Sequence, residues 1–150
     1  MGNIITPAGT TQFVATLSSP VSALTGDGTT ATLIWDTLAS GAGYSVSTGI
    51  FTAPVAATYL FLISVYCSGI TTSHTASILQ AIAASGNFQL LTFNLETAKT
   101  PGNVAMFPPG VLPLKMASGD TVYFNLQVSN GTKVVAFNTL STLSAARLIT

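Results

Sequence analysis

The stretch YSVSTGIFTAPVAATYLFLISVYC, residues 44–67, decides the fold that we predict for this chain. It contains a short strand, a turn at Thr48-Gly49, a second short strand, a corner at Pro54 and then a long strand over residues 58–67. One face of the long strand holds Tyr59, Phe61, Ile63, Val65 and Cys67. The other face holds Thr58, Leu60, Leu62, Ser64 and Tyr66. Because side chains alternate along a strand and the second face is also apolar at its centre, we expect this strand to be covered on both sides.

The remainder of the chain repeats this pattern of short strands separated by turn signals. Residues 121–129 alternate most clearly, and the Asn130-Gly131 pair after them predicts a two-residue hairpin in which residues 133–140 pair back. Residues 76–84 also read as a strand, although Ile78 and Ile82 fit a helical spacing. Further strands are predicted over residues 12–17, 30–36, 88–95, 111–116 and 143–149, with a long surface loop over residues 96–110. About ten short strands at this spacing predict an all-β sandwich.

The chain divides into a short arm and one domain. Residues 1–10 are small and apolar without a clear period, and we interpret them as an N-terminal arm that becomes ordered by docking, with Ile4, Ile5 and Pro7 as candidate docking residues. Residues 11–150 suit one core. The single cysteine excludes an internal disulfide framework, and we expect neither a signal peptide nor a membrane-spanning segment.

Charge is unusually scarce in this sequence. Four Lys and Arg and four Asp and Glu make 5% of the chain, whereas ordinary domains carry about 25%. Binding to nucleic acid or to an anionic membrane needs clustered Lys and Arg, so we expect neither partner. A neutral surface with uncharged strand edges tends to associate. We therefore expect an assembly that hides much of this surface.

Candidate chemistry is weak at every position. Cys67 and His74 could form a nucleophile and its base, but Cys67 falls on the core face of a strand and His74 in the polar loop after it. The carboxylates are Asp27, Asp36, Glu96 and Asp120. Asp27 lies between two glycines, where a calcium ion is conceivable, and Asp120 fits a turn in which it accepts backbone hydrogen bonds. We therefore predict no catalytic residue, no resident metal and no cofactor.

A set of aromatic, aliphatic and turn residues occurs in a characteristic order along the chain: Phe13, Leu17, Trp35-Asp36, Tyr44, Thr48-Gly49, Phe51, Pro54, Tyr59, Phe61, Leu114, Met116, Gly119-Asp120, Val122 and Leu148-Ile149. The order of these motif residues resembles the trimeric jelly-roll family of the complement first-component globular head and tumour necrosis factor. The central stretch is more similar to the complement-head branch. One departure is Ala57, because the family usually has glycine two residues before the tyrosine, and no collagen-like repeat precedes the domain.

The resemblance implies a ten-stranded sandwich of two sheets that assembles as a threefold homotrimer, with aromatic and aliphatic side chains around the axis. Candidate interface residues are Leu60, Leu62, Tyr66 and Tyr123. Such a trimer would cover the second apolar face of the central strand. The fold alone does not give a function.

These features together favour a non-enzymatic structural protein on the surface of a virion. We expect a homotrimeric bacteriophage capsid-decoration, head-fibre or tail-associated protein whose arm contacts other virion proteins. A module that recognises a glycan or a receptor through outer loops is an alternative, with Tyr66, Tyr123 and residues 102–110 as possible contacts. A bacterial spore or coat protein, or another extracellular surface protein of the same fold, is a further alternative.

Overall fold

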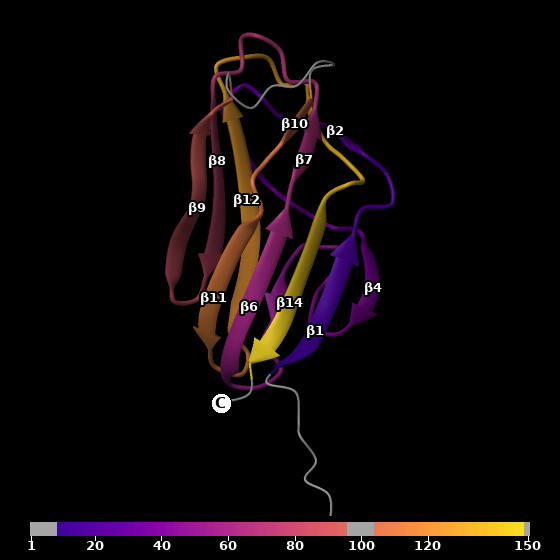
Figure 1. Cartoon of the computed structure of the whole chain (residues 1–150), viewed down its shortest axis with the longest axis vertical. Coiled ribbons are helices and arrows are strands. Elements are labelled where there is room, and N and C mark those ends of the chain that lie inside the picture. The colour runs from indigo at the N-terminus through magenta and orange to yellow at the C-terminus, as the bar shows by residue number, and fades with distance from the viewer. Residues whose placement is uncertain (1–8, 96–103, 149–150) are drawn as a thin grey trace, which may run out of the picture.

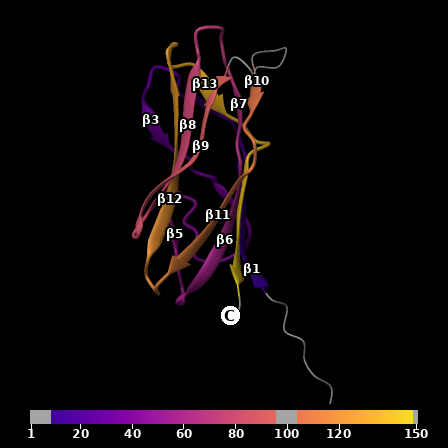
Figure 2. The ribbon, with the colours of Figure 1, turned by 60° about the vertical axis from the view of Figure 1, so that its left-hand side comes forward.

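The computed structural model describes residues 9–95 and 104–148, which form a sandwich of two antiparallel layers (Figures 1 and 2). The strands are β1 (Gly9–Thr16), β2 (Val21–Thr25), β3 (Thr30–Thr32), β4 (Thr37–Gly41), β5 (Phe51–Thr52), β6 (Ala57–Ser64), β7 (Tyr66–Ser68), β8 (Ala76–Ala83), β9 (Gly86–Asn94), β10 (Val104–Met106), β11 (Gly110–Met116), β12 (Thr121–Ser129), β13 (Val135–Phe137) and β14 (Thr142–Leu148). In the described residues no helix has the length and hydropathy to cross a bilayer.

The first layer contains two sheets that follow one another along the molecule. The lower sheet has the order β11-β6-β14-β1-β4, and the upper sheet has the order β10-β7-β13-β2. Figure 1 shows β7 continuing the direction of β6. The predicted long strand therefore breaks at Val65, whose carbonyl accepts a hydrogen bond from the Phe107 backbone N–H at 2.9 Å. This break and the short strands β2, β4 and β10, which lie where no strand was predicted, bring the described residues to fourteen strands instead of about ten.

The second layer is one sheet in the order β3-β12-β8-β9, with β5 paired to the start of β12. The alternation predicted for residues 121–129 is confirmed, because Val122, Phe124, Leu126 and Val128 are all 0% exposed. Residues 76–83 form the predicted strand β8, which pairs with β12 on one side and β9 on the other. These two pairings decide against the helical interpretation of Ile78 and Ile82.

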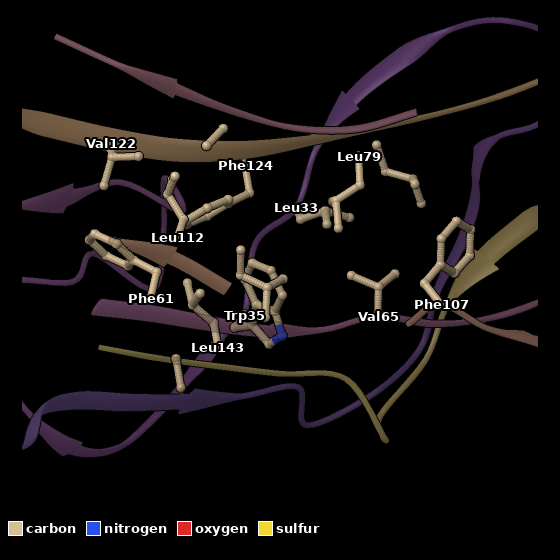
Figure 3. Close-up of a cluster of buried hydrophobic side chains, with 14 of the residues drawn as sticks. Leu33, Trp35, Phe61, Val65, Leu79, Phe107, Leu112, Val122, Phe124 and Leu143 are labelled. Atoms are coloured by element: carbon tan, nitrogen blue, oxygen red, sulfur yellow. The ribbon is translucent and has the colours of Figure 1, made fainter. Parts of the chain in front are cut away.

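Aromatic side chains from both layers fill the core (Figure 3). Trp35 packs edge-on against Phe137 and Phe124, with ring centroids 5.3 and 6.4 Å apart respectively. A second group joins Phe13, Tyr44, Phe51, Tyr59 and Phe61 through ring contacts of 5.1–5.5 Å. Such contacts add stabilisation beyond the burial of area. The motif residues of the central stretch therefore meet in one cluster.

The hairpin predicted at Asn130-Gly131 is wrong. Residues 135–137 form β13 in the other layer, where they pair with β2 and β7. They have no edge to pair with on β12, because β3 and β8 already occupy both sides of that strand. Asn130 has a φ of 73°, but Gly131 does not have the positive φ that a type I′ turn requires at its second position.

Three further predictions of local structure need correction. Residues 44–48 do not form a strand: Tyr44 makes only an isolated bridge with Phe51, and the Gly49 N–H donates to the Ser45 carbonyl at 2.8 Å to close the predicted turn. Only the first three residues of the predicted strand 30–36 are extended in a sheet. Val104–Met106 is strand β10 instead of loop. The proposed arm residues Ile4, Ile5 and Pro7 lie outside the described residues.

Candidate functional site

The outer surface of the first layer carries an exposed apolar band. Along β6 and β7 the outward side chains include Leu60, Leu62 and Tyr66, and Leu62 is 48% exposed. The register of β11 places Pro113 beside Leu60 and Val111, which is 57% exposed, beside Leu62. We call this band the apolar face; it consists of Leu60, Leu62, Tyr66, Met106, Val111, Pro113 and Ala146.

Charge is almost absent from the strands that form the apolar face. Strands β6, β7, β10, β11 and β14 contain two charged residues, Lys115 and Arg147. Lys115 pairs with Thr58 at the end of the band, and Arg147 is opposite the buried Tyr59. Large exposed apolar patches on a soluble protein mark interaction surfaces. The apolar face therefore has the properties of a contact surface for another protein.

The structure separates the four interface residues predicted from the sequence. Leu60, Leu62 and Tyr66 lie together on the apolar face, whereas Tyr123 belongs to β12 in the second layer. Its neighbours there are Ile82 on β8 and the polar outward side chains of β12. Because the outer surfaces of the two layers point in opposite directions, one flat contact does not include all four residues (Figure 2).

Sequence reasoning missed four of the seven residues of the apolar face. Met106, Val111, Pro113 and Ala146 join it only through the pairing of β10, β11 and β14 with the central strands. A partial signal was available in residues 110–116, where Leu112, Leu114 and Met116 alternate with exposed positions. That alternation identifies an outward face but not its neighbours.

Cys67 and His74 do not form a reactive pair. Burial raises the pKa of the Cys67 thiol to about 12, and the side chain is 0% exposed. His74 is also buried, and its Nδ1 accepts a hydrogen bond from the Thr71 backbone N–H at 2.9 Å. This fixes the proton on Nε2, which donates to the Thr132 carbonyl at 2.9 Å. Both ring nitrogens are occupied by these hydrogen bonds, so neither is free to act as a base. The histidine instead joins the loops that contain Thr71 and Thr132.

The described carboxylates hold turns and loops together. Asp120 accepts a hydrogen bond from the Ala117 backbone N–H at 2.8 Å, as predicted for its turn. Asp36 accepts from the Ser18 hydroxyl at 2.6 Å and from the Ser18 N–H at 2.7 Å, and these bonds lower its pKa. Among the residues that the structure describes, no three His, Cys, Asp or Glu lie close enough to hold a metal ion, and this includes Asp27. Glu96 lies outside the described residues.

Comparison with known proteins gives matches in structure only. No protein-family model matches the sequence, and no curated protein matches it. The globular domain of zebrafish complement 1qA superposes with a TM-score of 0.59 at 16% identity, over 92% of this chain and 96% of the other. The Eiger tumour necrosis factor of S. frugiperda gives 0.57 at 12% identity, over 95% and 94% of the two chains.

A third solved structure, of a vertex protein, is also similar. The vertex protein P5 of PRD1 gives a TM-score of 0.56 at 12% identity, over 95% of this chain and 74% of the other. At these identities the likeness establishes the fold alone. The chain therefore has the jelly-roll fold of the complement-head and tumour-necrosis-factor group, as its motif residues predicted.

Proposed function

We propose that this chain is a non-enzymatic structural protein of a bacteriophage particle and that it assembles as a homotrimer through the apolar face. A capsid-decoration, head-fibre or tail-associated position fits this role. The observation that carries the proposal is the exposure of Leu62, Met106 and Val111, which are 48%, 57% and 57% exposed on strands that carry almost no charge. The threefold symmetry comes from the family that the motif residues resemble.

The apolar face is suited to contact with a second copy. Burying a Leu, Val or Met side chain fully is worth about 1.5–3 kcal/mol, so covering the exposed half contributes about 1 kcal/mol for each side chain. None of the residues of the apolar face is charged, so burying this face against a second copy removes no charge of the face from water. Summed over three protomers, these contributions favour association and offset part of the entropy that association costs.

Two observations support a place on a virus particle. The fold is similar to that of the PRD1 vertex protein P5 over 95% of this chain. Residues 1–10, of which Gly9 and Thr10 already belong to β1, supply a short peptide in which Ile4, Ile5 and Pro7 would contact other virion proteins. In this arrangement the arm docks on the particle, and the opposite end of the sandwich faces outward.

The assembly is tested by light scattering behind a sizing column. The wild-type mass should be that of three chains, and Leu62→Arg should shift it to one chain, because three like charges would meet at the contact. Val46→Arg is the matched control, since Val46 is an exposed aliphatic residue at 38% that lies outside the apolar face. A monomeric wild type, or a Leu62→Arg variant that stays trimeric, contradicts the proposed interface.

The position on the particle needs a separate experiment. Protein mass spectrometry of purified virions should find this chain. Deletion of residues 2–8, which leaves β1 intact, should remove the chain from the particle while the free protein remains trimeric. If the shortened chain is incorporated as well as the full chain, the arm is not the docking segment. If purified virions lack the full chain, the structural role itself is wrong.

A further inference from the structure

The outer surface of the second layer differs in chemistry from the apolar face. Its cross-strand rows combine amide, hydroxyl and a few apolar groups, and Tyr123 is opposite Ile82 at one end. The next row runs Thr32, Asn125, Gln80 and Gln89 across the strands β3, β12, β8 and β9. We call this surface the amide face; it consists of Thr30, Thr32, Ile78, Gln80, Ile82, Gln89, Tyr123, Asn125 and Gln127.

Part of the amide face is held in place by its own hydrogen bonds. Thr32 Oγ1 donates to Asn125 Oδ1 at 3.0 Å, so the Asn125 amide nitrogen keeps its donors for another partner. Gln127 Nε2 donates to the Gly28 carbonyl at 2.7 Å and to Thr30 Oγ1 at 3.1 Å. These bonds fix the edge of the face before any ligand arrives, which lowers the entropy lost on binding.

The centre of the amide face keeps its hydrogen-bonding groups free. Within the described part of the chain, the Gln80 side-chain amide and the Tyr123 hydroxyl make no hydrogen bond to protein. Gln80 is on the strand next to Asn125, so two amides stand side by side with unused donors and acceptors. Tyr123 adds a rigid ring whose body is apolar and whose tip is polar.

The charge of the layer restricts the kind of ligand. Strands β3, β8, β9 and β12 contain no Lys, Arg, His, Asp or Glu. A phosphate, sulfate or carboxylate group would find no cation there, and a cationic ligand would find no carboxylate. A protein interface usually has an apolar core with aromatic and Arg anchors. Here amides occupy the centre, so the face suits a neutral ligand that is rich in hydroxyl groups.

We propose that the amide face binds a neutral glycan. The Tyr123 ring stacks against the C–H face of one sugar, while Gln80 and Asn125 exchange hydrogen bonds with sugar hydroxyls. Aromatic rings with adaptable amides and hydroxyls make up recognition surfaces elsewhere for the same physical reason. The binding site itself does not depend on the proposed trimer. A trimer that buries the apolar face would present three amide faces outward and add avidity.

The test uses a printed array of neutral and acidic glycans, followed by titration calorimetry with the soluble oligosaccharide that gives the strongest signal. The wild type should bind neutral glycans. Tyr123→Ala and Gln80→Ala should each raise the dissociation constant by about tenfold or more. Circular dichroism checks that both variants fold. Val46→Ala is the control, because Val46 is 38% exposed and lies outside both the apolar face and the amide face.

The outcomes separate this inference from the proposed assembly. The monomeric Leu62→Arg variant should keep the wild-type affinity for each site, measured with a monovalent oligosaccharide, even if it loses avidity on the array. Binding to acidic glycans only, or neutral binding that Tyr123→Ala and Gln80→Ala leave unchanged, overturns the inference. An array without any bound glycan also overturns it, and protection of β8 and β12 by a protein partner would then identify a protein surface.

Discussion

Replacing Gly131 with alanine tests whether His74 joins the loops at its end of the sandwich. A Cβ atom at this position would lie 2.4 Å from both Cδ2 and Nε2 of the His74 ring. That ring is 0% exposed and is bound at both nitrogens, by Thr71 and Thr132, so it has no easy way to move. Gly131 has no positive φ, so the substitution adds no backbone strain of its own.

The size of the effect follows from what the ring would lose. Moving His74 breaks the hydrogen bond from the Thr71 N–H and the one to the Thr132 carbonyl, each worth about 1 kcal/mol net. Repacking a buried ring against its neighbours adds about 1 kcal/mol or more. We therefore expect Gly131→Ala to lower the free energy of unfolding by about 3 kcal/mol, which is large for a single substitution to alanine.

The assay is urea unfolding at a fixed protomer concentration, because an oligomer's stability depends on concentration. Gly119→Ala is the matched control: Gly119 has a φ of 90°, and a Cβ added there would meet no atom within 4 Å, so this variant should lose only about 1 kcal/mol from backbone strain. The double variant Gly131→Ala with His74→Ala should lower the free energy of unfolding by less than the sum of the two single effects, because the ring that the added Cβ would meet is then absent. Equal losses for the two glycine variants, or additive losses in the double variant, would refute the steric argument.

Three other predictions address single residues. Ala23 in β2 has a φ of 51°, which glycine adopts with less strain than alanine. Ala23→Gly should therefore raise the free energy of unfolding by about 1 kcal/mol and the melting temperature by about 2–4 °C, and an unchanged melting temperature would contradict the strain. Asp36→Asn should lower stability by about 0.5–1 kcal/mol near neutral pH. Because the Ser18 bonds lower the folded-state pKa of Asp36, the wild-type advantage is present above the unfolded-state value near 3.8 and disappears as the pH falls through the folded-state value; a constant difference in acid would contradict this. Cys67, with its pKa raised to about 12, should resist iodoacetamide in the native protein and react in denaturant, and a fast native reaction would argue against its burial.

Local periodicity determined most of the strand positions and the inward side chains. Alternation in residues 121–129 predicted four core residues that the structure buries completely, and it also identified the core face of residues 58–67. Such predictions succeed because the alternation of side chains belongs to the strand itself and needs no knowledge of its partners. The resemblance of the motif residues then supplied the jelly roll, which no periodicity specifies.

Only the tertiary structure decided which strands pair and which surfaces result. Asn130-Gly131 has the composition of a hairpin turn, yet β12 is flanked by β3 and β8, so β13 crosses to the other layer. Tyr66 and Tyr123 both read as outward tyrosines, but they belong to opposite layers, one beside Met106 and the other beside Ile82. Alternation shows whether a side chain points inward or outward. Its neighbours depend on pairings between residues far apart in the chain, which the sequence pattern of one strand does not contain.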